Sequence, residues 1–549
     1  MFFRENPGLI TVELQNNPLE RIEGPFLISK SLLNLDISNC QLDYLNEFFF
    51  SDIPVLNYLD LSSNPLVELK SGIFSRIISL ETLKLNHCKL TKISKNVFDK
   101  LNNLKTLELK DNLLIGPLDW SQIFTPIVRL EYIDLRKSGV TEFPNNTFVN
   151  NIWLRSLILA ENNLNNFNLS TIFNEYLKNL HHLDLSFCNI NDALSISTFS
   201  NLINLRSLVL SYNEMSANVL QLILSPLKNL KKLSLSNCKL SKLPVNMFNK
   251  FSLLEELDLS LNPLNNVFKE LLNPLENLIL LNLSYCNLSY LSKDTFSKTN
   301  FLKTLILSNN PLKILQSGLF PNLKHLKRLE LNNCYLSSLN GTLFKDSLLY
   351  SDLEELYLSN NPLIISKNDS FLPKQLTNLK ILDLSYCNLS YIPVNSINSF
   401  GYITELYLQG NKLSNYNNDE SLEFLKILPK LEKLDISNNQ LKIIVPELFK
   451  FNPELKWLKL ENNPWLCDCH IAEMWEWAHI VKKDISIIAG SMLTQNKLYM
   501  LNSINSKALL CENVKEIGKG IKFNIETALL NRTWLRNIKE SICDSICIL

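Results

Sequence analysis

The 549-residue sequence is poor in glycine and has no excess charge of either sign. Its 12 glycines are scattered, and no Gly/Ser-rich or Pro-rich stretch divides the chain as a flexible linker would. Lys and Arg together number 54, as do Asp and Glu, so the composition indicates no bulk attraction to nucleic acid or to an acidic membrane. No run of 18 apolar residues occurs, and we therefore expect no membrane span in this chain.

Motifs of catalysis and export are missing as well. The chain has six histidines and contains no G-x-S-x-G, no phosphate-binding glycine loop and no H-E-x-x-H. We therefore predict no enzyme and no cofactor. The first residues, MFFRENPGLITVEL, do not form a signal peptide, because Arg4 and Glu5 interrupt a short apolar run. A repeating pattern is already under way there, so we expect the chain to be truncated at its N-terminus.

What the sequence does contain is one pattern, LxxLxLxxNxL, in nineteen copies mostly 24 to 26 residues apart. The LxL core of each copy predicts a short strand whose alternate side chains point inward. One copy cannot bury its own apolar face, so the copies must stack, and their strands then form a parallel sheet on the concave side of a curved solenoid. The copies begin at Leu9, Leu32, Leu56, Leu80, Leu104, Leu130, Leu154, Leu180, Leu205, Leu230, Leu254, Leu278, Leu302, Leu326, Leu353, Leu379, Ile403, Leu431 and Leu455.

This pattern resembles the leucine-rich repeat, in the typical form found in animal extracellular proteins. The resemblance implies an α/β-type leucine-rich repeat solenoid over residues 1–464, a curved horseshoe with a parallel concave sheet and an irregular convex side. A phenylalanine in the second half of many repeats is expected to stack into a spine on the convex side. These residues are Phe74, Phe98, Phe148, Phe248, Phe296, Phe320, Phe344 and Phe449.

The ninth position of the repeat alternates between asparagine and cysteine. A side chain there should turn inward and bond backbone groups that no strand satisfies. Successive cysteines lie two repeats apart, roughly 10 Å at about 4.8 Å per strand, whereas a disulfide needs Cα atoms within about 7 Å. We therefore predict free, buried thiols. The cysteines are Cys40, Cys88, Cys188, Cys238, Cys286, Cys334 and Cys387, and Ser138 replaces one of them.

The segment NPWLCDCH at residues 463–470 resembles the start of the cysteine-rich cap that ends extracellular leucine-rich repeat proteins. The resemblance implies a cap over residues 465–549, with a disulfide from Cys467 to Cys511 and a second from Cys469 to Cys543 or Cys547. One cysteine is then left over, either free or bridged to another chain.

Two further expectations concern the same segment. A zinc site from Cys467, Cys469 and His470 with one of the last two cysteines is the alternative to disulfides, but C-x-C-H spacing suits tetrahedral ligation poorly. We therefore expect no metal. The tryptophans Trp465, Trp475 and Trp477 are expected to cover the apolar end of the last repeat.

The sequence also carries eight N-x-S/T glycosylation sequons. Disulfides and sequons together favour an oxidising compartment, so we predict an extracellular or cell-surface location. The four sequons predicted to carry glycans are Asn287, Asn388, Asn340 and Asn531.

The concave sheet is the predicted binding surface. Its charged residues face opposite charges one repeat away: Lys231 and Lys232 beside Glu255 and Glu256, and Lys327 and Arg328 beside Glu354 and Glu355. Cross-strand pairing is the interpretation we favour, and a charged footprint for a ligand is the alternative.

Aromatic and apolar side chains are the better candidates for ligand contacts, because Tyr and Trp are enriched at binding hot spots. Longer loops at Lys345–Ser351 and Ser414–Leu428 are further candidates. The candidate binding residues on the strands are Tyr132, Ile279, Leu280, Tyr357, Tyr407 and Trp457, and those near strand exits are Tyr285 and Tyr386, with Phe187 and Tyr212 beside them.

Overall the chain resembles the ectodomains of Toll-type receptors, chaoptin-like adhesion proteins, Slit and the acid-labile subunit. The resemblance implies extracellular protein–protein recognition, as an adhesion molecule or receptor ectodomain binding a protein ligand or cell-surface partner on the concave face. Homophilic or dimeric association is possible, and no nucleic acid partner is expected. One alternative is a fragment of a Toll-like receptor ectodomain. Another is an intracellular scaffold or enzyme regulator, which predicts twelve free thiols, whereas two disulfides leave eight of the 12 cysteines free.

Overall fold

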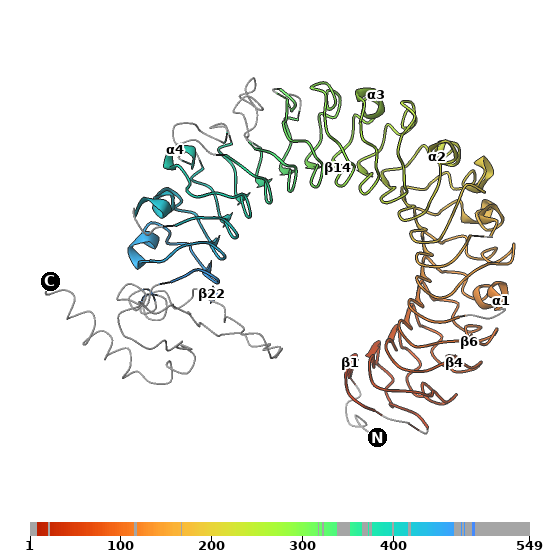
Figure 1. The fold of residues 1–549 in the computed structure, drawn as a ribbon. Helices are drawn as coiled ribbons and strands as arrows, with labels where there is room; N and C mark the ends of the chain where they lie inside the picture. The colour runs from red at the N-terminus through yellow and green to blue at the C-terminus, as the bar shows by residue number, and fades with distance from the viewer. Residues whose placement is uncertain are drawn as a thin grey trace, which may run out of the picture. The chain divides into compact units, whose positions relative to one another are not determined.

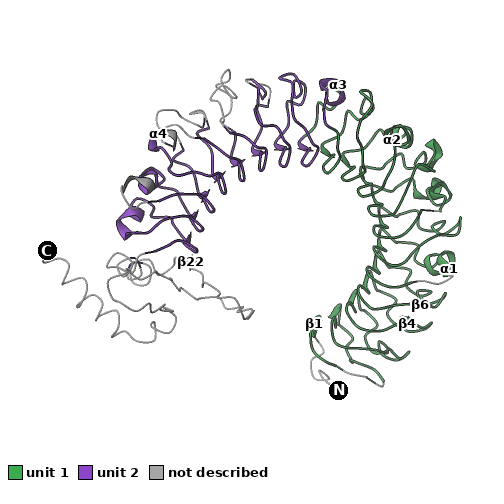
Figure 2. Ribbon diagram, in the orientation of Figure 1, with its two compact units in different colours: residues 1–264, 274–278 green, residues 265–273, 279–549 purple. Residues whose placement is uncertain are grey.

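The computed structural model describes residues 8–465 together with Met474, Trp477 and Ser486–Ile488. Within 8–465 it leaves out residues 20–21, 23, 115–117, 166, 317, 321–322, 338–351, 365–371, 373–375, 398–399 and 415–418. The chain divides into two compact units (Figure 2). Unit 1 comprises residues 1–264 and 274–278, and unit 2 comprises residues 265–273 and 279–549.

Unit 1 is built on a row of parallel three-residue strands, each paired in register with the strand of the next repeat. A second, two-stranded sheet pairs β4 (Glu68–Leu69) with β6 (Lys92–Ile93). The main row runs β1 (Thr11–Glu13), β2 (Asn34–Asp36), β3 (Tyr58–Asp60), β5 (Thr82–Lys84), β7 (Thr106–Glu108), β8 (Tyr132–Asp134), β9 (Ser156–Ile158), β10 (His182–Asp184), β11 (Ser207–Val209), β12 (Lys232–Ser234) and β13 (Glu256–Asp258).

Unit 2 continues the same construction. Its parallel row runs β14 (Leu280–Asn282), β15 (Thr304–Ile306), β16 (Arg328–Glu330), β17 (Glu355–Tyr357), β18 (Ile381–Asp383), β19 (Glu405–Tyr407), β20 (Lys433–Asp435), β21 (Trp457–Lys459) and β22 (Ser486–Ile488). Strands β1 to β21, without β4 and β6, fall one in each of the nineteen repeats, so the repeat prediction is confirmed.

Short helices lie on the side of each unit away from the strands (Figure 1). Helix α1 begins at a polar cap, where the Asp119 carboxylate accepts from the backbone N–H of Gln122 at 3.1 Å. None of the helices in the described part of the chain combines the length and hydropathy needed to cross a bilayer. They are α1 (Trp120–Phe124), η1 (Leu169–Thr171), η2 (Glu175–Leu177), η3 (Ile196–Thr198), α2 (Ala217–Leu224), α3 (Lys269–Leu272), α4 (Val394–Ile397), η4 (Asp419–Ile427) and η5 (Pro446–Phe449).

The core of each unit lies between strands and helices. The aliphatic residue at the centre of each main strand from β1 to β21 is buried, as at Leu83, whose two strand neighbours are half-buried. The predicted phenylalanine spine is confirmed at several steps, where Phe74 stacks on Phe98 with ring centroids 6.2 Å apart and Phe296 packs on Phe320 at 6.1 Å. Phe344 lies outside the described residues. Aliphatic and aromatic burial, repeated once per turn, therefore holds the stack together.

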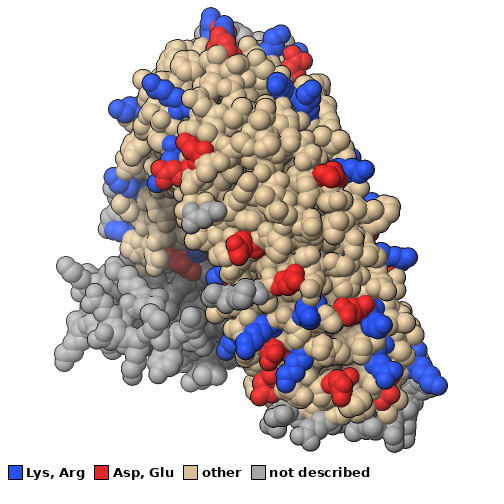
Figure 3. Space-filling model, turned by 90° about the vertical axis from the view of Figure 1, so that its right-hand side faces the viewer, with Lys and Arg blue, Asp and Glu red and all other residues tan. Residues whose placement is uncertain are grey.

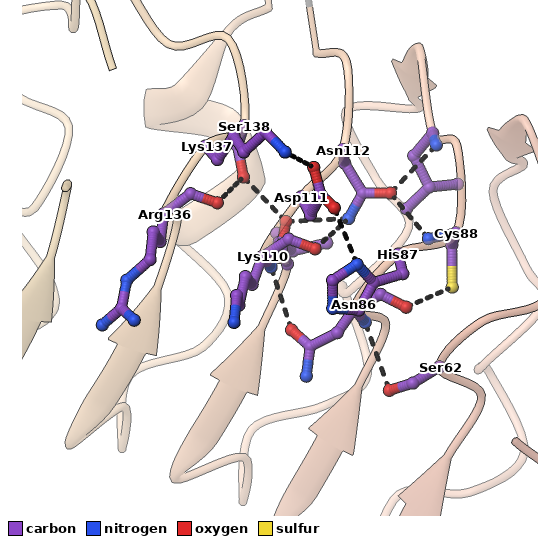
Figure 4. A network of polar contacts seen from close by, with 12 residues as sticks. Ser62, Asn86, His87, Cys88, Lys110, Asp111, Asn112, Arg136, Lys137 and Ser138 are labelled. Atoms are coloured by element: carbon purple, nitrogen blue, oxygen red, sulfur yellow. Dashed lines mark hydrogen bonds and ion pairs between the residues drawn. The ribbon is translucent and has the colours of Figure 1, made fainter. Parts of the chain in front are cut away.

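The ninth position forms the ladder that the sequence predicted (Figure 4). The side-chain oxygen of Asn112 accepts from the backbone N–H groups of Cys88 and Leu90 one repeat earlier, at 3.1 and 3.0 Å. Its amide donates to the carbonyls of Leu85 and Leu109 at 2.9 and 2.7 Å. One buried asparagine thus satisfies four backbone groups that the three-residue strands leave unpaired.

The cysteines of this ladder are free and buried, as predicted. The thiol of Cys88 donates to the carbonyl of Leu61 at 3.3 Å, and burial raises its pKa to about 12. Ser138, which replaces cysteine once, donates in the same way to Leu109 at 2.7 Å. In the repeats without asparagine, position nine therefore holds a small buried side chain that donates a hydrogen bond.

The C-terminal end of the repeats is only partly described. Trp465 is buried and its indole N–H donates to the carbonyl of Leu460 at 3.0 Å. Trp477 stacks on Phe449 with ring centroids 5.4 Å apart. Both contacts agree with tryptophans packing at this end. Cys467, Cys469, Cys511, Cys543 and Cys547 lie outside the described residues, so the disulfide cap over 465–549 stays a prediction.

Candidate functional site

The candidate site is the strand face, which we define as the outward side chains of the residue before each main strand and of that strand's first and third residues. It presents mixed charges within each unit. Lys231 and Lys232 of unit 1 bond Glu255 and Glu256 at 2.5 and 2.7 Å. In unit 2, Lys327 bonds Glu354 at 2.7 Å. These contacts confirm the cross-strand pairing that the sequence favoured.

Arg328 shows how closely the strand face of unit 2 is paired. Its guanidinium bonds Glu330 at 2.7 Å and Glu355 at 2.6 Å, and lies 4.6 Å from the ring centroid of Tyr357. Glu354 lies between Lys327 and Lys380, and hydrogen bonds from these two lysines lower its pKa. A face neutralised in this way offers little net charge to steer a ligand.

The other side chains predicted to bind from the strand face are also engaged in internal contacts. Tyr357 donates its hydroxyl to Glu355 at 3.1 Å, and Tyr407 donates to Glu405 at 2.7 Å. Desolvation raises the pKa of Tyr132 to about 12. All three tyrosines are half-buried, as are Ile279, Leu280 and Trp457, which we had expected to stand exposed. At Tyr357 the physical reason is that the guanidinium of Arg328, from the preceding repeat, lies over the ring.

A second line of residues runs along the edge where the strands end. We call it the exit ridge and define it as the eighth residue of each repeat, three positions after the strand. Its aromatic members are Phe187, Tyr212, Tyr285 and Tyr386, and their side chains are between 38% and 54% exposed. Tyr285 and Tyr386 thus lie just past the ends of β14 and β18, near the strand exits where the sequence placed them.

The backbone of the exit ridge is left-handed throughout the described repeats that have a non-glycine residue there. Phe187 has φ of 53°, Tyr212 of 61°, Tyr285 of 56° and Tyr386 of 54°. Asn suits this conformation, whereas a bulky residue pays about 1 kcal/mol or more for it. Strained, exposed aromatic residues on a rigid ladder are typical of binding sites.

Neighbouring ridge side chains contact one another. Phe187 stacks on Tyr212 with ring centroids 3.8 Å apart and an interplanar angle of 13°. Closer to the N-terminus, His87 bonds Asp111 at 2.8 Å, and Lys137 bonds the other oxygen of that carboxylate at 3.1 Å (Figure 4). Hydrogen bonds from Lys137 and His87 lower the pKa of Asp111. Sequence reasoning could not see these pairs, because they depend on side-chain direction at a positive φ.

The rest of the surface gives no competing charged site on the face shown in Figure 3, where basic and acidic side chains are interspersed. Two of the predicted glycosylation sites, Asn287 and Asn388, are exposed just beyond the exit ridge. Asn340 and Asn531 lie outside the described residues, as does the loop Lys345–Ser351. The loop Ser414–Leu428 contains η4, and the structure omits its residues 415–418.

Comparison with known proteins agrees with this architecture. A leucine rich repeat model matches residues 54–114 and 415–464, a BspA type leucine rich repeat region model matches residues 265–393, and a further leucine rich repeat model matches residues 229–251. The chain is a leucine-rich repeat protein. Its parallel strands and position-nine ladder agree with that assignment along both units.

Three relatives illustrate what this leucine-rich repeat protein is similar to. It is 37% identical over 135 residues to receptor like protein 27 of Arabidopsis thaliana, 36% over 104 residues to protein toll of Drosophila melanogaster, and 30% over 112 residues to the leucine-rich repeat transmembrane protein FLRT2 of Rattus norvegicus. These stretches cover 21%, 18% and 20% of this chain, but only 16%, 9% and 16% of the relatives. The chain thus resembles Toll-type ectodomain repeats, and none of the three is named as an enzyme.

Solved structures show the same fold. The crystal structure of a TLR13–ssRNA13 complex superposes with a TM-score of 0.63 at 23% identity, covering 87% of this chain and 74% of the other. An LRR protein of Leptospira interrogans superposes with a TM-score of 0.57 at 24% identity, covering 76% of this chain and 98% of the other. At such identities the likeness concerns the fold alone.

Proposed function

We propose that this protein recognises a protein ligand outside the cell, as an adhesion molecule or a receptor ectodomain. Exposed aromatic residues in left-handed backbone on the exit ridge carry the proposal, since such residues gain little from folding and much from a partner. The similarity to receptor like protein 27 supports it, and so does a strand face whose charges are paired with one another.

The ligand would lie along the concave strand face and the exit ridge beside it. The ladder of asparagines and stacked phenylalanines holds these side chains in place, so binding would need little ordering of the receptor. The ridge aromatic residues would supply affinity, and the paired charges of the strand face would select partners. A second copy of the chain is one possible partner.

A binding screen tests the proposal. Purified chain would be screened against an array of extracellular ectodomains, and hits would be titrated with the variants Phe187→Ala and Tyr212→Ala. Trp153→Ala is the matched control, because Trp153 is also an exposed aromatic residue and lies away from the ridge. We expect a loss of about tenfold or more in affinity for a ridge variant and none for the control. Unchanged binding in every ridge and strand-face variant would contradict the proposal.

The compartment is tested separately by counting thiols in denaturant without reductant. The extracellular proposal expects eight free thiols of the 12 cysteines and glycans at Asn287 and Asn388. Twelve free thiols without glycans would favour the intracellular scaffold instead.

A further inference from the structure

Unit 2 carries a small pocket away from the strand face and the exit ridge. It has a volume of about 230 Å³ and lies between the segment that opens α3 and the second half of the next repeat. The residues that matter for its chemistry are Asn266, Phe268, Lys269, Glu270, Tyr290 and Asp294. Its residues belong to unit 2 alone.

Two aromatic side chains flank the pocket and remain accessible. Phe268 is 57% exposed and Tyr290 is 51% exposed. Each stands next in the chain to a buried residue, Val267 beside Phe268 and Leu291 beside Tyr290. Neither ring stacks on another aromatic ring in the part of the chain that the structure describes. The pocket therefore offers aromatic faces to a ligand.

The charge of the lining is negative. Glu270 and Asp294 are exposed, and neither forms an ion pair with any residue that the structure describes. Lys269 is the single cation of the lining, which leaves a net charge of −1 from two carboxylates and one ammonium. The negative faces of aromatic rings add to this preference for positive charge.

The strand face of unit 2 shows which group an aromatic ring and two carboxylates can bind together. There, Arg328 lies over the ring of Tyr357 and bonds the carboxylates of Glu330 and Glu355. The pocket presents the same kinds of groups, an aromatic face with two carboxylates, to solvent. The lining thus matches a guanidinium or an ammonium group in chemistry.

We propose that this pocket binds an organic cation, an ammonium or guanidinium group held against Phe268 and Tyr290 and neutralised by Glu270 and Asp294. The volume fits one such head group, since pockets for drug-sized ligands run from about 300 to 1,000 Å³. The cation could be a free quaternary ammonium compound or the side chain of a protein. This inference does not depend on the ligand proposed for the concave face.

The first experiment uses the full chain and two small probes of equal shape. Choline and its neutral carbon analogue 3,3-dimethylbutan-1-ol would be compared by saturation-transfer NMR. We expect saturation transfer to choline that weakens as ionic strength rises, and at least about threefold weaker binding of the neutral analogue. Equal binding of the two probes would overturn the proposal, because charge would then play no part.

Variants locate the binding. Tyr290→Ala and Asp294→Asn should each weaken choline binding by about threefold or more. Tyr335→Ala is the matched control, because Tyr335 is also an exposed aromatic residue of unit 2. Since all these side chains are exposed, the variants should keep the thermal unfolding midpoint of the parent. A parent-like affinity in both pocket variants would overturn the assignment.

A second set of probes separates the two sources of the cation. Peptides containing arginine, lysine or trimethyllysine would be titrated beside choline. Tighter binding of a peptide identifies a protein side chain, and binding of choline alone identifies a free ammonium compound. An N-acetylglucosamine oligomer would also be titrated. If it binds at this pocket and neither choline nor any of the cationic peptides does, the proposal is overturned in favour of a saccharide site.

Discussion

The side chain of Asn112 and the backbone of Cys88 are joined across one repeat by a hydrogen bond of 3.1 Å. The same asparagine bonds three further backbone groups, and its counterparts recur through both units. Since the strands are only three residues long, these buried bonds replace the ladder that longer strands would form.

Removal of that asparagine should therefore be strongly destabilising. Asn112→Ala removes this partner from the buried N–H groups of Cys88 and Leu90 and from the carbonyl of Leu85, whereas the carbonyl of Leu109 keeps Ser138. Each lost partner costs about 1–3 kcal/mol, so we expect a loss of at least about 3 kcal/mol. Urea unfolding of the purified chain measures it. Asn300→Ala, at an exposed position, is the matched control. A loss under about 1 kcal/mol for Asn112→Ala would show that water replaces the ladder bonds.

The ladder thiols should be inert in the folded chain. Burial raises the pKa of Cys88, Cys188 and Cys387 to about 12, from a usual value near 9. Alkylation by iodoacetamide at pH 8 should therefore be slow until urea unfolds the protein, as mass spectrometry would show. Rapid native labelling of these residues would mean that the repeats open.

The same shifts predict a loss of stability in alkali. The unfolded chain releases thiol protons above about pH 9, whereas the folded chain retains them until about pH 12, so the free energy of unfolding should fall as pH rises between these values. Cys88→Ser should reduce the slope, because serine does not titrate there and Ser138 shows that a hydroxyl fits. If the free energy of unfolding of Cys88→Ser falls with pH as steeply as that of the parent, groups other than this thiol cause the loss of stability in alkali.

Acid should weaken the ion pairs of the strand face. Hydrogen bonds from Lys327 and Lys380 lower the pKa of Glu354 below its usual value of 4.5. Its contribution is present above pH 4.5 and lost as pH falls through the lowered value. At pH 7, Glu354→Gln should lower the free energy of unfolding by less than Asn112→Ala does. The difference between Glu354→Gln and the parent should vanish in acid or in high salt. Chemical unfolding at pH 7 and pH 3 provides the comparison.

Gly410 should be intolerant of a side chain for two separable reasons. It has φ of 71°, and a Cβ there would collide with the ring of Tyr386. We expect Gly410→Ala to cost about 1 kcal/mol for backbone strain plus a further steric term. In a Tyr386→Ala background only the strain should remain, and a double-mutant cycle on unfolding free energies measures the difference. If the changes in unfolding free energy caused by Gly410→Ala and Tyr386→Ala are additive, the ring of Tyr386 moves aside without cost.

The sequence by itself determined the repeat, its strands and the role of position nine. Leucines at fixed spacing must be buried once per turn, and Asn64 or Cys88 at position nine must satisfy backbone groups, so both follow from local pattern and burial. The pairing of Lys327 with Glu354 also followed, because adjacent parallel strands bring equivalent positions together.

Only the tertiary structure decided which aromatic residues are available to a partner. Tyr357 and Tyr407 looked exposed in the sequence, but each is half-buried and donates its hydroxyl to a glutamate of its own strand. Phe187 and Tyr212, by contrast, stack in the open on a left-handed backbone. The pocket beside Tyr290 was equally hidden, since it joins residues from two repeats. Exposure and contact depend on side chains about one repeat away in sequence, and the repeat pattern fixes where those side chains start but not where they point.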